Sequence, residues 1–222
     1  MKKVIAFQKK IKRNNNRDWF SKHKADYEES NQELKNFTQD LMLEMQKHDH
    51  MEETGTKIFR IYRDVRFSND KTPYTLHRSF SMKRATDALR GGYYMRIQPG
   101  QSCIVGGFFG PEAKDLLHIR KQIQQEPDEL RKILNSRATK SYFGELMGEQ
   151  VKTAPKGFSK DDPAIDLIRF KGFMLRHDFT DDELMAKNAV KKVSDGFKKM
   201  RPFFDYMSEI LTTDLNGNSL LD

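Results

Sequence analysis

The chain has 222 residues and carries 40 lysines and arginines against 32 aspartates and glutamates, a formal net charge of +8. Its single cysteine excludes a disulfide framework and any metal site built from several cysteines. No apolar run approaches the roughly 18 residues that a membrane span needs, so we predict a cytoplasmic protein with no membrane partner. Linkers rich in Pro, Gly or Ser are absent, which predicts one domain over residues 1–222.

Helices are predicted in the N-terminal quarter. Three apolar residues at helical spacing predict a short amphipathic helix over residues 4–11. The run Asn14-Asn-Asn16 interrupts it, and asparagine is a favoured helix N-cap because its side chain accepts a backbone N–H. A second helical region runs from residue 17 to about residue 48, and its length predicts a break near His23 or Lys24.

After Gly55 the apolar period changes from helical to alternating. Residues 58–67 alternate apolar with polar side chains, which predicts a strand with one face on a core. A loop follows over residues 68–74, where Pro73 forbids a central strand. Further strands are predicted over residues 76–84, 93–98, 102–109 and 170–179.

Helices return in the C-terminal half, and together with the strands they predict the fold class. Thr180 and Glu183 have the spacing of a capping box, which predicts the start of a helix. Further helices are predicted over residues 111–125, 127–135, 162–168, 185–200 and 203–213. Helices at both ends of a block of strands with short connections indicate an α+β fold. We therefore predict an antiparallel sheet of about residues 57–110 plus a strand near residues 170–179, covered by N-terminal and C-terminal helices.

The positive charge is unevenly distributed. Residues 1–24 carry a net charge of +8, residues 25–56 carry −7, residues 57–96 carry +7, and the rest of the chain is neutral. A basic block can mark a polyanion partner, because neutralised phosphates release counterions. The alternative is that the acidic block folds against the basic strands and cancels their charge.

The densest candidate site lies in residues 60–74, which we call the motif loop. Its candidate ligand-binding residues are Arg60, Arg63, Asp64, Arg66, Asp70, Lys71 and Tyr74. The predicted strand would place Arg63 among apolar neighbours, where a guanidinium needs a partner. We expect that partner to be Asp70, a carboxylate of the acidic helix, or a ligand beyond the sheet edge.

Two interpretations of the motif loop stay open. Guanidinium forks match carboxylate and phosphate oxygens, which favours a site for a small anionic, phosphorylated ligand in a basic, aromatic-lined cleft. In that site Arg60, Arg66 and Lys71 would hold the anion. Asp64 would orient an arginine or act as a base, and Tyr74 would donate a hydrogen bond. The alternative is a salt-bridge network that only clamps the fold, in a structural or protein-interaction domain.

A nucleic-acid-binding module is a further alternative. Aromatic residues interleave with arginines along the predicted strands, a pattern typical of sheets that stack bases. Secondary candidate residues on these strands are Arg78, Tyr94 and Arg96. No RNA-recognition consensus accompanies them, and half of the aromatic residues must face the core by strand parity. The sequence therefore favours a discrete anion site over a nucleic-acid surface.

No metal or cofactor site is expected. The tract His48-Asp-His50 is not followed by a third ligand at a helical offset. The segment Asp214–Asn218 opens like a calcium loop but lacks the glycine required at the sixth position. Gly106–Pro111 leads into a predicted helix without matching a phosphate-loop or dinucleotide fingerprint, so a bulge or tight turn is the better interpretation. No nucleophile and base are placed together, so the sequence predicts no reaction type.

Several segments carry a family resemblance. They are Asn14-Asn-Asn-Arg-Asp-Trp-Phe20, Arg60-Ile-Tyr-Arg-Asp-Val-Arg-Phe-Ser-Asn-Asp-Lys-Thr-Pro-Tyr74, Gly91-Gly-Tyr-Tyr94, Gly107, Pro111, Ile119-Arg120, Pro155-Lys-Gly-Phe158 and Lys171. In this order and spacing the chain resembles, over roughly residues 4–210, the bacterial and fungal family catalogued as domain of unknown function 2461. The resemblance implies one domain and marks the seven motif-loop residues as signature positions, and it implies no activity. Arg120 and Lys156 lie in its segments and are further secondary candidates.

Overall fold

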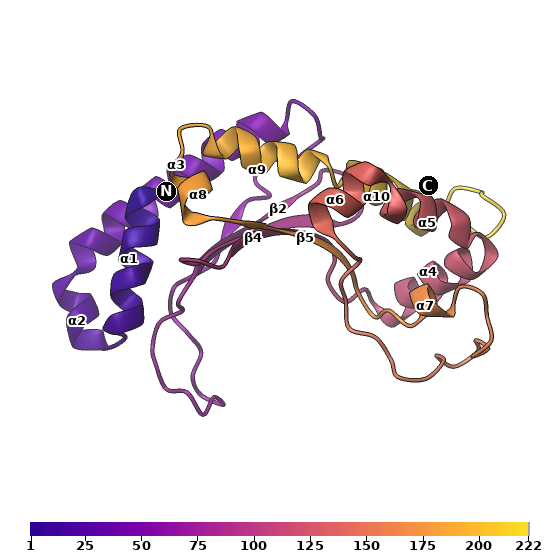
Figure 1. Ribbon diagram of the computed structural model, residues 1–222, viewed down its shortest axis with the longest axis horizontal. Coiled ribbons are helices and arrows are strands. Elements are labelled where there is room, and N and C mark those ends of the chain that lie inside the picture. Colours follow the sequence, from indigo (N-terminus) through magenta and orange to yellow (C-terminus); the bar gives the residue numbers. More distant parts are fainter. Residues whose placement is uncertain (222) are drawn as a thin grey trace. The chain divides into compact units, whose positions relative to one another are not determined.

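The computed structural model describes residues 1–221, whose ten helices and five-stranded antiparallel sheet confirm the predicted α+β fold (Figure 1). The strands are β1 (Lys57–Ile58), β2 (Arg78–Lys83), β3 (Gly92–Ile97), β4 (Ser102–Phe108) and β5 (Phe173–Phe179). Their order in the sheet follows their order in the chain. Short turns can connect successive antiparallel strands, as Pro99-Gly100 does between β3 and β4.

The helices of the first quarter are α1 (Lys2–Arg13), α2 (Arg17–Lys22) and α3 (Lys24–Met45). The Asn16 side chain caps α2 by accepting the Trp19 backbone N–H at 2.9 Å, which confirms the predicted cap. The predicted break is also confirmed, because His23 alone separates α2 from α3. This connection matters below, since α2 forms one wall of the candidate site.

The remaining helices lie near their predicted positions with several shifted starts, and those predicted over residues 162–168 and 185–200 begin at Ile165 and Ala189. Thr180 and Glu183 form the predicted capping box, with the Glu183 N–H donating to Thr180 Oγ1 at 3.2 Å. The first helix after β4 begins at Ala113 rather than at Pro111. The elements are α4 (Ala113–Gln125), α5 (Pro127–Asn135), α6 (Arg137–Phe143), α7 (Ile165–Ile168), α8 (Asp181–Met185), α9 (Ala189–Lys198) and α10 (Arg201–Thr212).

The chain divides into two compact units, which are described separately. The first consists of residues 1–83, 94–104 and 178–196, and the second of residues 84–93, 105–177 and 197 onward. Strands β3, β4 and β5 contribute residues to both units. The division does not test whether the chain is one domain, and that prediction stays a prediction.

In the first unit, α1 packs along α3 and α3 packs on the sheet. The Phe37 ring of α3 lies 6.4 Å from the Phe80 ring of β2, centroid to centroid. Along α1, Lys3 pairs with Glu29 and Lys10 with Asp26 of α3, both at 2.8 Å. Part of the acidic block therefore pairs with the basic N-terminal helix and not, as the alternative had it, with the basic strands.

In the second unit, α10 packs its aromatic residues on the sheet. The Phe204 ring lies 4.9 Å from the Tyr93 ring and 6.0 Å from the Phe108 ring, centroid to centroid. The Arg84 guanidinium lies 5.5 Å from the Phe204 ring and donates to Asp205 at 3.0 Å. A buried guanidinium is tolerated here because a carboxylate and an aromatic face both compensate its charge.

The strand predicted over residues 58–67 is wrong, because β1 ends at Ile58 and the following residues form a loop. Only a single bridge, between Tyr62 and Tyr74, pairs the two sides of this loop. Ile61 is buried as the alternation predicts, but Phe67 is 97% exposed. The apolar alternation therefore does not continue as a buried face beyond Ile61.

Two aspartates of the loop explain why the strand stops. Asp64 Oδ1 accepts the backbone N–H of Arg66 at 3.2 Å, and Asp70 Oδ1 accepts that of Thr72 at 2.9 Å. An aspartate that accepts the N–H two residues ahead stabilises a turn, and it competes with a hydrogen-bonded strand ladder. The motif loop is thus a structured loop rather than part of the sheet.

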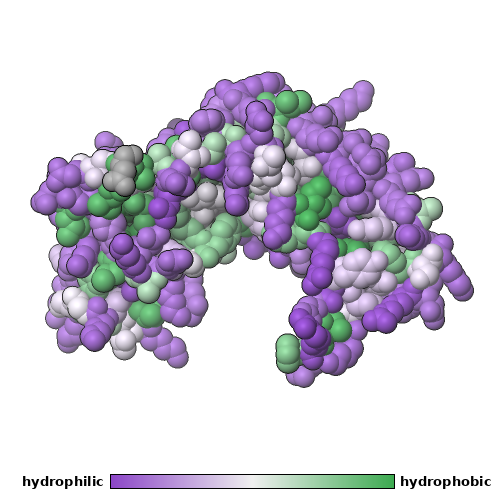
Figure 2. Space-filling model, turned by 180° about the vertical axis from the view of Figure 1, so that it is seen from behind, coloured by the Kyte–Doolittle hydropathy of each residue, from purple (hydrophilic) through white to green (hydrophobic). Residues whose placement is uncertain are grey.

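The surface agrees with the high content of charged residues. Figure 2 shows hydrophilic side chains over most of the face that it draws, with hydrophobic residues in smaller patches between them. Among residues 1–221, none of the helices combines the length and the apolar character that crossing a bilayer requires.

Candidate functional site

The first unit contains an open cleft of about 1110 Å³ with two walls. One wall comes from residues 15–24, which begin before α2 and end at the start of α3, and the other from residues 62–74 of the motif loop. Four of the seven predicted residues line the cleft, namely Arg63, Asp70, Lys71 and Tyr74. The other three, Arg60, Asp64 and Arg66, do not line it and are exposed.

Aromatic rings form the floor of the cleft. Phe20 and Tyr74 stack with their centroids 4.2 Å apart and their planes 15° apart. Tyr74 is buried against the core that also contains Phe7 and Ile61. Burial raises the pKa of the Tyr74 hydroxyl, so this phenol stays protonated at neutral pH and keeps a proton to donate.

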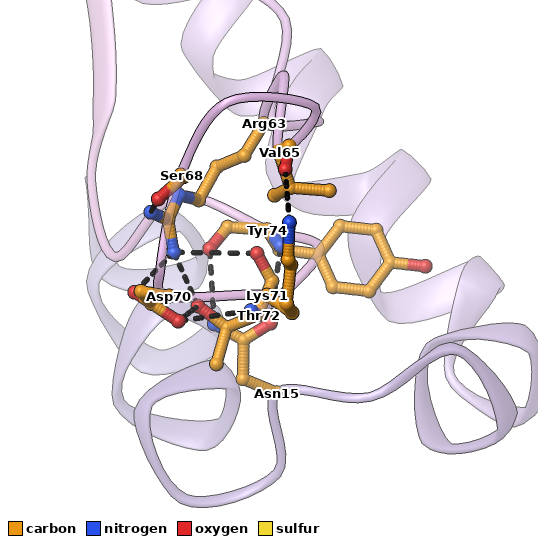
Figure 3. A network of polar contacts seen from close by, with 8 residues as sticks. All are labelled: Asn15, Arg63, Val65, Ser68, Asp70, Lys71, Thr72 and Tyr74. Atoms are coloured by element: carbon orange, nitrogen blue, oxygen red, sulfur yellow. Dashed lines mark hydrogen bonds and ion pairs between the residues drawn. The ribbon is translucent and has the colours of Figure 1, made fainter.

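The Asn15 side chain joins the two walls. Its Nδ2 donates to the Tyr74 carbonyl at 2.9 Å, and its Oδ1 accepts the Tyr74 N–H at 3.1 Å (Figure 3). The amide thus pairs with the Tyr74 backbone as a neighbouring strand would, and it satisfies both polar groups of a buried residue. This contact holds the α1–α2 connection on the motif loop.

Arg63 is the centre of a polar network inside the motif loop (Figure 3). Its Nη1 donates to Asp70 Oδ2, to Thr72 Oγ1 and, at 3.3 Å, to the Thr72 carbonyl. The expected pairing of Arg63 with Asp70 is confirmed. Arg63 and Asp70 therefore shape the loop, and a direct role for them in ligand binding stays a prediction.

The network makes a pH-dependent prediction. The Thr72 amide and hydroxyl, and then the Arg63 guanidinium, lower the pKa of Asp70 from 3.8 to about 2. Because the folded-state pKa is depressed, this stabilisation is present above the ordinary pKa and is lost as the pH falls from about 4 to about 2. We expect Asp70→Asn to be less stable than the parent at pH 7 and to lose less stability over that acid range. Urea unfolding midpoints at several pH values check this, and parallel pH profiles for parent and variant would contradict it.

Lys71 and Arg66 differ in whether a carboxylate of the protein already pairs with their charge. Lys71 Nζ donates to the Val65 carbonyl at 3.0 Å and has no ion-pair partner among residues 1–221. Arg66 instead forms a fork with Asp64, with nitrogen–oxygen distances of 3.0 and 2.7 Å. Arg66, and to a smaller extent Arg60, lower the pKa of Asp64, and Asp64 raises the pKa of Arg66 in return. Lys71 therefore keeps donors for a ligand, whereas the Arg66 fork is occupied.

Sequence reasoning missed the cations of the opposite wall. Arg17 and Lys24 line the cleft, and the Arg17 side chain makes no hydrogen bond or ion pair within residues 1–221. The positive charge of Arg17 lowers the pKa of Tyr74, opposing the effect of burial. Lys24 contacts Glu28 only at 3.8 Å, with both side chains well exposed. With Arg63, Lys71 and a single carboxylate, the lining carries a net charge of +3.

Two of the secondary candidates in the first unit have protein partners. Arg78 is only 2% exposed, donates to Asn31 Oδ1 at 2.8 Å and lies 5.4 Å from the Tyr27 ring. Arg96 donates to the Gln101 carbonyl at 3.3 Å. Neither side chain lines the cleft. The structure therefore does not bring them together with the motif-loop residues.

The other secondary candidates also lie outside the cleft. Tyr94 is on β3. Arg120, in the second unit, donates to the carbonyls of Ile168 at 2.8 Å and Phe170 at 3.1 Å, so it ties α4 to the end of α7. Lys156 is exposed in the loop before α7. Within residues 1–221 no three side chains of the metal-binding types gather into a metal site.

Comparison with known proteins gives one match. The family model described as "Conserved hypothetical protein (DUF2461)" matches residues 3–206. No curated protein and no solved structure matches the chain. The match covers both walls of the cleft and the whole motif loop.

Proposed function

The chain belongs to the DUF2461 family, whose description names no activity, and from the cleft we propose that it is a cytoplasmic protein that binds a small anionic ligand. Phosphorylated metabolites are the class that the cleft fits best. The observation that carries the proposal is that Arg17 and Lys71, on opposite walls, have no ion-pair partner among residues 1–221. Cations that converge on one cleft and keep free donors favour an anion between them.

The chemistry of the lining supports a phosphate more than a simple counterion. Arg17 offers a planar fork that matches two phosphate oxygens, and Lys71 adds a compact charge with donors left over after Val65. The Tyr74 phenol remains protonated and offers a neutral donor from the same lining. The lining therefore offers three donors of different kinds, and a tetrahedral anion has enough oxygens to accept several of them.

The residues proposed to hold the anion differ from those predicted from the sequence. The sequence assigned this task to Arg60, Arg66 and Lys71, and of these only Lys71 lines the cleft. Arg17 takes the place of the two arginines. Arg63 keeps the loop in shape through its contacts with Asp70 and Thr72, so the salt-bridge network and the anion site exist side by side.

Binding measurements with point variants test the proposal. We expect inorganic phosphate and a set of phosphorylated metabolites, titrated at constant ionic strength, to include ligands that raise the melting temperature. Arg17→Ala and Lys71→Ala should each weaken binding roughly tenfold or more, since each removes a charge-assisted hydrogen bond. Isothermal titration calorimetry measures the affinities.

The matched control is Arg66→Ala, which removes an exposed arginine of the same loop that is paired with Asp64 outside the cleft. Its affinity should stay within twofold of the parent. If no phosphorylated compound binds, or if Arg66→Ala weakens binding as much as Arg17→Ala, the proposed site is wrong.

A further inference from the structure

Three aromatic side chains line the cleft, and of these only Tyr62 is half exposed. Its exposed fraction is 51%, whereas Phe20 and Tyr74 are 4% and 3% exposed. The two buried rings are used by the core, so they cannot offer a face to a ligand. Tyr62 can, because half of its surface remains open within the lining.

The position of the Tyr62 ring is fixed by its surroundings. Its centroid lies 5.9 Å from that of Phe20 and 5.3 Å from that of Tyr74, and both contacts are tilted. The Tyr62 backbone forms a β-bridge with Tyr74, and the Asn15 side chain hydrogen-bonds to the Tyr74 backbone. An exposed aromatic ring supported in this way loses little conformational entropy when a flat group stacks on it. The free energy of stacking therefore contributes almost fully to binding.

The volume of the cleft also favours an organic ligand. Its volume of about 1110 Å³ is far larger than an inorganic phosphate requires. Sites for organic ligands typically enclose about 300–1,000 Å³. The cationic residues Arg17 and Lys71 account for an anionic group, and the exposed Tyr62 ring remains for the rest of the ligand.

We propose that the ligand of this cleft is a nucleotide, whose phosphate meets Arg17 and Lys71 and whose planar base stacks on Tyr62. This inference rests on the proposed function and adds the class of ligand. Stacking tolerates any base, because every base has a flat face. A free mononucleotide and the end of a nucleic-acid strand present the same two groups, so the test below separates them.

Calorimetric titrations with three probes test the inference. The probes are adenosine 5′-monophosphate, ribose 5-phosphate and inorganic phosphate. We expect the mononucleotide to bind the parent at least tenfold more tightly than ribose 5-phosphate, which lacks the base. Tyr62→Leu should remove that difference and leave the affinity for ribose 5-phosphate within twofold, whereas Tyr62→Phe should retain it.

Phe67→Leu is the matched control, because Phe67 is a 97% exposed aromatic of the same loop that does not line the cleft. It should change none of the affinities. Equal binding of the mononucleotide and ribose 5-phosphate to the parent would overturn the inference while leaving the proposed function intact. Failure of every phosphorylated probe would remove the proposed function as well.

A competition experiment distinguishes a free nucleotide from the end of a nucleic-acid strand. A fluorescent mononucleotide bound to the parent is displaced by unlabelled mononucleotide or by a 5′-phosphorylated single-stranded hexanucleotide. Displacement at lower concentration by the mononucleotide supports a free nucleotide as the ligand. Displacement at lower concentration by the hexanucleotide supports a strand end, bound through the same phosphate and base. If neither displaces the probe, the label rather than the nucleotide was bound, and the inference fails.

Discussion

Phe20→Ala is expected to destabilise the protein by about 3–5 kcal/mol, the usual cost of removing a buried phenylalanine and leaving a cavity. Phe20 is 4% exposed and stacks on Tyr74, and its ring also lies 5.1 Å from that of Tyr27. Removing it takes away the support of the cleft floor. We therefore expect ligand binding to be lost together with stability.

Urea unfolding of Phe20→Ala and of Phe20→Leu measures the effect. Leucine keeps most of the apolar volume and should cost clearly less than alanine, so the pair separates cavity formation from loss of the ring. A cost below about 1 kcal/mol for Phe20→Ala would show that the floor is not packed as described.

Gly107→Ala is expected to have a comparably large effect in the second unit. Gly107, on β4, has a φ of +149°, a conformation that residues with a Cβ rarely adopt. A Cβ at this position would overlap the Phe173 carbonyl oxygen and lie 2.8 Å from Met174 Cα. Both obstacles are backbone atoms of the neighbouring strand β5, so no side chain can move aside. We expect a loss of at least about 3 kcal/mol, from backbone strain and from separation of the two strands.

Gly100→Ala is the control for the strain alone. Gly100 has a φ of +73° in the β3–β4 turn, and a Cβ there would meet nothing within 4 Å. Its cost should be limited to about 1–2 kcal/mol for the left-handed conformation. Thermal unfolding of both variants measures the difference, and equal melting temperatures would contradict the predicted clash at Gly107.

The parts of the structure that depend on neighbouring residues could be predicted from the sequence. The Asn16 cap and the Thr180–Glu183 capping box are set by side chains within three residues of their partners. The pairing of Arg63 with Asp70 was one of three alternatives that the sequence left open, and it is the one that the structure shows. The hairpin of β3 and β4 could be predicted because Pro99-Gly100 marks the turn between them.

The alternation of residues 58–67 does not produce a strand because the turns at Asp64 and Asp70 compete with it. Half of the cleft was missed for a different reason. Asn15 and Tyr74 are 59 residues apart in the chain, and no local pattern shows that they meet. Arg17 and Lys24 therefore looked like ordinary members of a basic N-terminal segment. Their proximity to the motif loop is a product of tertiary packing.

The contact between Asn15 and Tyr74 has a consequence for the order of events in folding. The cleft cannot exist in an unfolded or half-folded chain, because its two walls meet only when a loop of nearly sixty residues has closed. Loop closure costs entropy that contacts across the closed ends must offset. The proposed ligand, bridging Arg17 and Lys71, would add such a contact at that junction. Its binding would then be thermodynamically linked to completion of the first unit, and it would act as a cross-link that forms only in the native chain.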